Sequence, residues 1–198
     1  MSGRPALGCL LEIVETLVLT LVIFFVIQTF VAQPYQVKQM SMETTLEPGQ
    51  YVLVDKLTPR IDPYKRGDIV VFKPPPDWVQ PDNTPFIKRV IGVGGDTVEV
   101  RDDGKVYVND VAINEPYLYA DGDVPEPTDA DPDLNSWTIP HGELFLMGDH
   151  RRNSADSRAF GAVPVDNVIG RAWLRYWPID TFGILATPTY PELAPDAP

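Results

Sequence analysis

The sequence predicts a mainly β protein, in which one antiparallel β domain follows a single N-terminal transmembrane helix. Three observations indicate this fold class. Residues 16–32 carry no charge, a length close to the roughly 17–25 residues that cross a bilayer as a helix. The rest of the chain is divided into short runs rich in Val, Ile, Phe and Tyr. Its 21 prolines and 14 glycines interrupt the chain too often for a helical bundle.

The apolar segment is the first element. It is apolar on all sides, whereas a helix buried in a soluble domain is apolar on one stripe. A cleaved signal peptide would have a more basic start, and a small residue where Phe30 stands before a cut. We therefore favour an uncleaved anchor within residues 1–35, although Glu12 and Glu15 lie close to it. Basic residues on its two sides nearly balance, so charge alone sets no orientation.

Six short β segments are predicted after the anchor, within a single domain that we place at residues 36–182. Several of them alternate apolar and polar residues, and turns rich in Gly, Pro, Asn and Asp separate them. Residues 98–108, VEVRDDGKVYV, are typical of a hairpin with a glycine-containing turn. The predicted segments are 51–57, 68–73, 86–93, 96–101, 105–110 and 143–148.

Three other stretches are predicted to lack regular structure. Residues 73–85 contain five prolines, which excludes a central strand. Residues 119–136, the acidic excursion, contain six acidic residues and three prolines. A calcium loop over its alternating aspartates would lack the required Gly and Glu, so we interpret it as a solvated, variable segment. Residues 183–198 are rich in proline and are predicted to form a flexible tail.

Composition argues against several classes of function. A net charge of −12 disfavours a nucleic-acid partner, which needs a basic surface. Cys9 is the single cysteine, and the two histidines, His141 and His150, lack metal-ligand spacing, so we expect neither a metal nor a cofactor. GVGGD, residues 92–96, resembles a phosphate loop, but a strand pattern follows it instead of a helix, which favours a β-turn.

A serine nucleophile has two candidate bases in this sequence. His150 lies among serines and aspartates in one loop, but a triad usually draws its members from separate elements, and no G-x-S-x-G elbow is present. The other candidate is Lys88, which apolar residues flank. Burial would lower the lysine pKa and let the neutral amine accept a proton. By pattern alone, however, a lysine at a strand edge is more often a solvated charge.

Four sequence boxes follow the anchor in order, and they resemble the conserved boxes of type I signal peptidases. SMETTLEPGQYVLVDKL (41–57) is similar to S-M-x-P-T-L, and KRGDIVVFKPP (65–75) to the R-G-D box. FIKRVIGVGGDTV (86–98) is similar to the lysine box, and GELFLMGDHRRNSADSRAFGAVP (142–164) to the G-D-N-x-x-N-S-x-D-S-R-x-x-G box. The resemblance implies a membrane-bound serine endopeptidase with an antiparallel β-sheet catalytic domain, which removes signal peptides from exported preproteins.

The resemblance also implies roles for individual residues. Ser41 would be the nucleophile and Lys88 the general base, with no cofactor. Ser154 would orient the lysine, while Asp156 and Arg158 would form a supporting ion pair. Three further residues would hold the last box in place: Arg89, Asp149 and Asn153.

The oxyanion and substrate sites follow from the same resemblance. The backbone N–H of Ser41 would be one oxyanion donor, and Gln39 stands where many relatives have a smaller second donor. Thr44 replaces the usual proline, which we expect to alter only loop stiffness, and His150 replaces a frequent Asn without a catalytic role. Small apolar pockets would be lined by Val37, Met40, Met42, Leu46, Phe86 and Ile87.

The resemblance implies cleavage after a small residue at A-x-A sites of preprotein signal peptides. The protein would be a single-pass monomer in the cell membrane, with its N-terminus in the cytoplasm and its catalytic domain on the extracytoplasmic face. Trp173, Trp177 and Ile179 would contact the bilayer or pack in the core. Two alternatives are a self-cleaving Ser/Lys protease, which would need a DNA-binding domain in place of the anchor, and an inactive membrane-anchored β scaffold.

Overall fold

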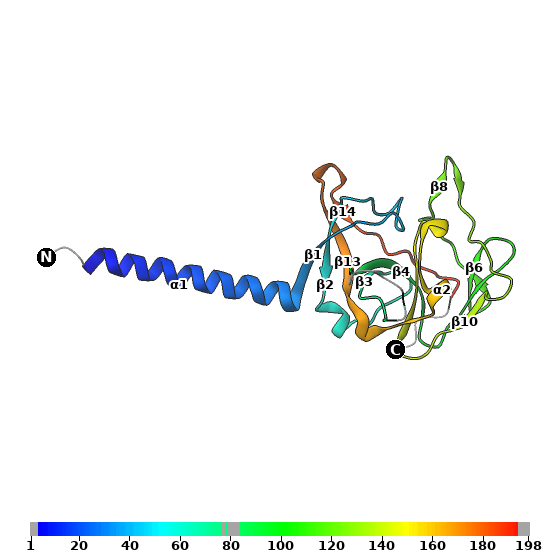
Figure 1. Cartoon of the computed structure of the whole chain (residues 1–198), viewed down its shortest axis with the longest axis horizontal. Coiled ribbons are helices and arrows are strands. Elements are labelled where there is room, and N and C mark those ends of the chain that lie inside the picture. The colour runs from blue at the N-terminus through cyan, green and yellow to red at the C-terminus, as the bar shows by residue number, and fades with distance from the viewer. Residues whose placement is uncertain (1–3, 77, 79–83, 194–198) are drawn as a thin grey trace.

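A long helix projects from a β domain in the computed structural model, which describes residues 4–76, 78 and 84–193 (Figure 1). The helix consists of α1 (Arg4–Val26) and a π-helical continuation, η1 (Ile27–Val31). Within it, Gly8–Val31 has a mean hydropathy of 2.6, is long enough to cross a membrane, and leaves its most apolar stretch exposed in the structure. These properties fit a single membrane anchor.

The anchor passes directly into the sheet. Strand β1 (Ala32–Gln36) starts at the residue after η1 and pairs antiparallel with β2 (Tyr51–Asp55). Lys56 Nζ donates to the carbonyl of Gln28 in η1 at 3.4 Å and to the side chain of Gln33 in β1 at 3.0 Å. The junction is therefore fixed by strand pairing and by one lysine, with no linker between helix and strand.

The main sheet has eight strands, and each pairs antiparallel with its neighbours. Their order is β1-β2-β13-β3-β4-β11-β12, with β14 paired to β13. The longest strand, β13, thus lies between β2 and β3 although it comes late in the chain. The remaining bounds are β3 Ile69–Phe72, β4 Phe86–Val93, β11 Glu143–Met147, β12 Val163–Pro164, β13 Val168–Trp177 and β14 Gly183–Ile184.

A smaller sheet of order β10-β5-β6-β7 forms the far end of the domain, away from the helix (Figure 1). Its β5–β6 pair confirms the predicted hairpin. A separate two-stranded hairpin, β8–β9, stands out from the domain. The strands are β5 Thr97–Val100, β6 Val106–Val108, β7 Val111–Ala112, β8 Ala120–Asp121, β9 Val124–Pro125 and β10 Ser136–Thr138. The short helices are η2 Thr58–Arg60, η3 Arg151–Asn153, α2 Ser157–Phe160, η4 Val165–Asn167 and η5 Ile179–Thr181.

Strand β4 is buried along its whole length, which matters for the lysine that it carries. Strands β3 and β11 flank it, and apolar clusters cover both of its faces. Phe86 and Val90 pack into one cluster, and Ile87 packs into another. Because side chains alternate along a strand, Lys88 lies on the same face as Phe86 and Val90. This position places its amine in a mostly apolar environment.

The structure confirms the six predicted β segments, with shorter bounds for most of them, and adds elements that the sequence pattern did not predict. Strand β13 is the main addition. The predicted loop 73–85 has no strand among its described residues, whereas residues 77 and 79–83 lie outside the described residues. The acidic excursion contains β8 and β9, and its Thr128 is fully buried. The excursion is therefore partly built into the domain instead of being wholly solvated.

The predicted flexible tail differs from the structure over its described part. Strand β14 pairs with β13, and the hydroxyl of Tyr190 lies 2.9 Å from that of Tyr117 in the core. Leu193 packs against the same core cluster. The packed structure thus continues past residue 182 to residue 193, because apolar side chains of the tail find partners on the domain. Residues 194–198 lie outside the described residues.

Candidate active site

Ser41 and Lys88 face each other in a groove of the domain. Lys88 is only 1% exposed and Ser41, in the turn after β1, is 4% exposed. Lys88 Nζ donates a hydrogen bond of 2.5 Å to Ser41 Oγ, although the two residues are 47 positions apart. The ring centroid of Phe86 lies 5.2 Å from the same nitrogen. The fold therefore brings the two predicted catalytic residues into direct contact.

Burial lowers the pKa of Lys88 from 10.5 to about 8. The negative charges of Asp156 and Asp149 act in the opposite direction and limit this decrease, while the Arg158 charge adds to it. With this pKa, about a tenth of the molecules carry a neutral Lys88 amine at pH 7, far more than with the ordinary lysine pKa of 10.5. The neutral amine has a free electron pair with which to accept the proton of the Ser41 hydroxyl.

The nucleophile lies on a tight turn with an unusual backbone. The carbonyl of Ser41 accepts a hydrogen bond of 3.1 Å from the N–H of His150, and the N–H of Glu43 donates to the Met40 carbonyl at 3.1 Å. Thr44 has a φ of 81°, a conformation uncommon for a β-branched residue. A proline ring fixes φ near −65°, so the family's usual proline does not fit this backbone. Thr44 therefore changes the shape of the turn and not only its stiffness.

A buried ion pair lies beside this turn. Arg89 donates from Nε and Nη2 to the two carboxylate oxygens of Asp149, at 2.9 and 2.7 Å, and both side chains are at most 1% exposed. Thr45 Oγ1 donates to the same carboxylate at 2.6 Å, and Arg89 Nη1 donates to the Gly67 carbonyl at 2.9 Å. These contacts connect the turn after Ser41, strand β4, the R-G-D turn and the last sequence box.

A second charged pair, Asp156 and Arg158, lies within the last box. Arg158 donates to both carboxylate oxygens of Asp156 at 2.9 Å, and Gly148 N–H donates to that carboxylate at 3.0 Å. Burial alone would raise the pKa of Asp156, but the hydrogen bonds and charge of Arg158 outweigh it and hold the pKa below its usual value. The carboxylate thus stays ionised, and its charge limits how far the Lys88 pKa falls.

Ser154 and Asn153 line the groove. The resemblance implies that Ser154 orients Lys88, but the buried Ser154 Oγ forms no hydrogen bond with the Lys88 amine in this structure. Asn153 is exposed to solvent. Gly148 explains why the loop comes so close to the nucleophile: an added Cβ there would lie 2.5 Å from the Ser41 carbonyl oxygen. Only glycine fits at this position.

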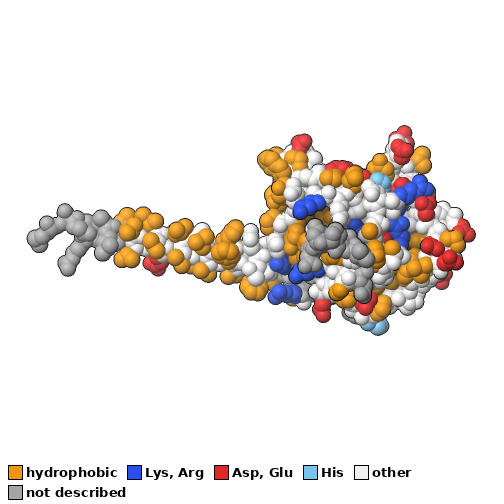
Figure 2. Space-filling view, viewed as in Figure 1, with side chains coloured by type: hydrophobic (Ala, Val, Ile, Leu, Met, Phe, Trp, Pro, Cys, Tyr) orange, Lys and Arg blue, Asp and Glu red, His pale blue; other side chains and the backbone are white. Residues whose placement is uncertain are grey.

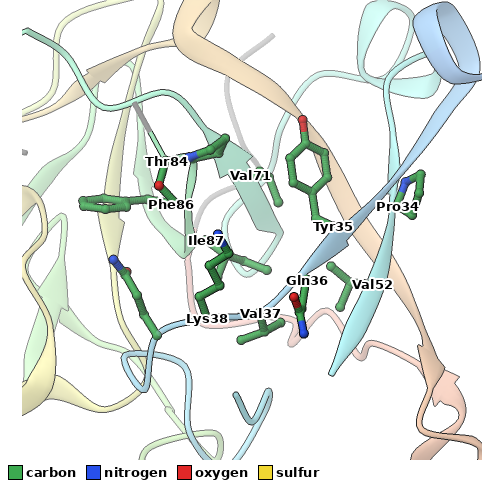
Figure 3. A pocket seen from close by; sticks show the side chains of 12 residues that line it. Pro34, Tyr35, Gln36, Val37, Lys38, Val52, Val71, Thr84, Phe86 and Ile87 are labelled. Atoms are coloured by element: carbon green, nitrogen blue, oxygen red, sulfur yellow. The ribbon is translucent and has the colours of Figure 1, made fainter. Parts of the chain in front are cut away.

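Two neighbouring hollows form the groove. The first has a volume of about 510 Å³ and contains Ser41 and Lys88 in its wall. The second has a volume of about 390 Å³ and extends along β1 toward the anchor (Figure 3). Lys38, Gln39 and Phe86 line both hollows, so the two are adjacent.

The structure brings most of the predicted pocket residues to this groove, but not all. Val37, Phe86 and Ile87 line the second hollow, and Met40 lines the first. Met42 and Leu46 do not line either hollow: both are 0% exposed, in the core cluster behind the groove. The turn points them inward because their backbones form one helical hydrogen bond, of 2.7 Å. Sequence reasoning missed several lining residues, which strand alternation would have indicated: Tyr35, Val52 and Val71.

Comparison with known proteins identifies the family. A family model described as "Signal peptidase, peptidase S26" matches residues 10–177. The chain is 35% identical to signal peptidase I of Mycobacterium tuberculosis, over 92% of this chain and 78% of that protein. It is 38% identical to signal peptidase I of Leptolyngbya laminosa, over 90% and 85% of the two chains. Signal peptidase IB of Staphylococcus aureus is 35% identical, over 87% and 92%.

A solved structure of a signal peptidase I from Enterococcus faecalis is also similar, at 34% identity. The match covers 55% of this chain and 95% of that one, with a TM-score of 0.44. The family model gives the class, a peptidase, and the apolar helix before the antiparallel β domain indicates a membrane-anchored one. The chain belongs to the signal peptidase I family, a family of serine endopeptidases, and this membership supports the removal of signal peptides as its activity.

Proposed function

We propose that this protein cleaves signal peptides from exported preproteins with a Ser41 nucleophile and a Lys88 general base. The observation that carries the proposal is the 2.5 Å hydrogen bond between a buried lysine amine and the serine hydroxyl. The low pKa of Lys88, about 8, supports the assignment because a protonated amine cannot accept the serine proton. The intact charged pairs beneath the dyad argue against an inactive scaffold.

The reaction proceeds through an acyl-enzyme. Ser41 Oγ attacks the scissile carbonyl while neutral Lys88 takes its proton, and the ammonium then protonates the leaving amine. Lys88 next takes a proton from the water that attacks the ester carbonyl, and its ammonium returns this proton to Ser41 Oγ as the ester bond breaks and the signal peptide leaves. The backbone N–H of Ser41 and the side chain of Gln39, which lines the groove beside it, would stabilise the oxyanion.

The buried charged pairs would position Ser41 and Lys88 and influence the pKa of Lys88. Arg89 and Asp149 hold strand β4 and the nucleophile turn at a fixed separation. Asp156 and Arg158 set the local charge on which the Lys88 pKa depends. Ser154 and Asn153 line the same hollow as Ser41 and Lys88, where they would contact the residues after the cut.

Substrate recognition would use the groove along β1. Residues 35–40 offer an edge to which the end of a signal peptide adds as an extended strand. A small residue immediately before the cut would lie beside Phe86, and the one two positions earlier would lie between Val37 and Ile87. This arrangement would give the A-x-A preference.

The bilayer would be the second partner, and the protein would act as a monomer with its N-terminus in the cytoplasm. The end of the domain from which α1 leaves also carries η2 and the β13–β14 turn (Figure 1). Large apolar side chains are exposed there, at Ile61 (85%), Ile179 (72%), Phe182 (62%) and Trp177 (51%). Figure 2 shows hydrophobic side chains along the helix and at this edge of the domain. Trp173 is 39% exposed on the same strand. These residues would hold the groove against the lipid surface.

The proposal is tested with detergent-solubilised full-length protein and a preprotein that carries an A-x-A site. We expect cleavage after the final alanine by the wild type only, and none by Ser41→Ala or Lys88→Ala. Circular dichroism and thermal unfolding would establish that both variants are folded. Cleavage by either clean variant would contradict the dyad. A folded but inactive wild type would instead favour the scaffold alternative.

Membrane orientation needs a separate measurement. Cells are stripped of the envelope layers outside the cytoplasmic membrane, and protease is added. The protease should digest the catalytic β domain in these cells and should not digest it in inverted membrane vesicles. The reverse pattern would place the catalytic domain in the cytoplasm and exclude a role in processing exported proteins.

A further inference from the structure

His150 holds the nucleophile turn at two points. Its backbone N–H donates to the carbonyl of Ser41 at 3.1 Å. Its ring nitrogen Nδ1 lies 2.5 Å from Oε2 of Glu43, two residues after the nucleophile. Both side chains are largely shielded from solvent, at 15% and 18% exposure. The last sequence box therefore contacts the turn through a side chain that the proposed mechanism does not use.

The opposite side of the same ring faces the acidic excursion, residues 119–136. The ring of Tyr119 stacks on His150 with centroids 3.9 Å apart and planes inclined by 10°. Oε2 of Glu126 lies 3.8 Å from Nε2 of His150. The excursion is held in this position because Tyr119 N–H donates to the Asp149 carbonyl at 3.1 Å and Glu126 N–H donates to the Tyr119 carbonyl at 2.7 Å.

The two ring nitrogens thus face two carboxylates from different parts of the chain. Nδ1 is within hydrogen-bond distance of Glu43 in the nucleophile turn, whereas Nε2 is at ion-pair distance from Glu126 in the excursion. Arg152 lies beside this cluster: its backbone N–H donates to Oε2 of Glu126 at 3.1 Å, and its Nε lies 3.8 Å from Oε1 of the same carboxylate. The His150 ring therefore connects the nucleophile turn with the excursion.

We propose that His150 is a positioning residue that links the nucleophile turn to the acidic excursion. The Glu43 contact would hold the turn in its reactive shape. The stack on Tyr119 and the Glu126 contact would hold the excursion against the same ring. This inference deepens the proposed function and rests on it in one respect, which is that Ser41 is the nucleophile. It also gives the acidic excursion a connection to the active site.

The first test compares three variants of full-length enzyme on the same preprotein. His150→Ala removes both ring contacts, and we expect kcat to fall roughly tenfold with little change in KM, because a charge-assisted hydrogen bond is lost. His150→Asn keeps a neutral donor where Nδ1 stood, so kcat should recover to within about threefold of wild type. His141→Asn changes the other, exposed histidine and should have no effect.

A double-mutant cycle makes this test specific to the Glu43 contact. Glu43→Gln in the His150→Ala background should cause no further loss, since the two side chains act through one contact. A kcat of His150→Ala equal to wild type would overturn the positioning role, and so would full additivity of the two changes.

The second test does not depend on catalysis. Amide hydrogen exchange of residues 119–128 is measured in the wild type, His150→Ala and His141→Asn under the same conditions. In His150→Ala, protection should be at least about threefold lower than in the wild type, since the ring that stacks on Tyr119 and faces Glu126 is lost. In His141→Asn it should equal that of the wild type. Equal protection in His150→Ala and the wild type would overturn the link. If exchange responds as expected while no preprotein is cleaved, the proposed function fails and the link stands.

Discussion

The ion pairs beneath the dyad and those at the rim of the groove use the same chemical groups but differ in burial. The Arg89–Asp149 pair is at most 1% exposed, whereas the side chains of the Arg152–Asp129 pair are 53% and 66% exposed. Their shortest distances are nearly equal, at 2.7 and 2.9 Å. A surface pair exchanges partners with water at little cost, but a buried charge that loses its partner stays unsolvated. Burial, and not distance, therefore decides how much stability is lost when one member of each pair is removed.

The largest expected effect lies at the buried side of this comparison. Lys88→Ala should lower kcat/KM for a peptide with an A-x-A site by at least about 10⁴-fold, because removing one member of a catalytic unit removes most of its effect. Lys105→Ala, which changes an exposed lysine in the β5–β6 turn, should leave kcat/KM unchanged. Steady-state kinetics with a fluorogenic peptide would measure both. Loss of activity in both variants would point to a general charge effect instead of a dyad.

Asp149→Ala tests the buried ion pair itself. It should destabilise the protein by about 3–5 kcal/mol, since Arg89 would remain buried without a counter-charge. Urea unfolding of the full-length protein in detergent, followed by circular dichroism, would measure the free energy of unfolding. A loss of less than about 1 kcal/mol would mean that water or Thr45 replaces the carboxylate, and that the contrast with the rim is weaker than burial implies.

The pH dependence of activity is the next largest effect. Because the Lys88 pKa is lowered to about 8, the amine is protonated and inactive below that pH and becomes neutral above it. We therefore expect the rate of Ser41 acylation to rise with pH through about 8 and then level off, where an unperturbed lysine would titrate at 10.5. Acylation by a serine-reactive inhibitor, followed by mass spectrometry, would measure this rate.

Asp156→Asn sharpens the same measurement. The negative charge of Asp156 raises the Lys88 pKa, so its removal should move the midpoint of the profile to lower pH. A shift to higher pH would show that the carboxylate acts on Lys88 by some route other than its charge.

The smallest effect is expected at the rim. Asp129→Ala breaks the exposed pair with Arg152 and should change the free energy of unfolding by less than about 1 kcal/mol, in the same urea experiment. A loss as large as that of Asp149→Ala would abolish the distinction between rim and buried pair.

Local patterns in the sequence predicted strands with near partners, such as β5 and β6, and strands with distant partners, such as β4 and β11. The β5–β6 hairpin is the best example, since its alternation and its turn are contained in residues 98–108. Strand β13 was missed because many of its residues are only partly buried, so it lacks a regular alternation of apolar and polar residues. It is a strand because it pairs with β2 on one side and β3 on the other. At Gly170 an added Cβ would lie 2.3 Å from the Asp55 carbonyl oxygen, a constraint that no local pattern reveals.

The sequence allowed the reacting residues of the site to be predicted, but not how deeply their side chains are buried. The sequence boxes indicated Ser41 and Lys88 as the reacting pair, whereas the residue pattern alone favoured a solvated lysine. What buries Lys88 is its place in β4, with β3 and β11 on either side. Met42 and Leu46 were predicted to line the groove but are buried in the core. The direction of their side chains depends on the backbone hydrogen bonds of the turn, which the sequence pattern does not reveal.

The direct passage from η1 into β1 has a consequence for which substrates fit. About nine peptide units separate Ala32 from Ser41, at most roughly 30 Å of extended chain, and no flexible spacer lies between the helix and the strand. With the proposed membrane anchor, the height of Ser41 above the lipid headgroups would be set by the backbone between η1 and the nucleophile. A signal peptide in the same bilayer would be cleaved only where the number of residues between its apolar core and its cut site matches that height.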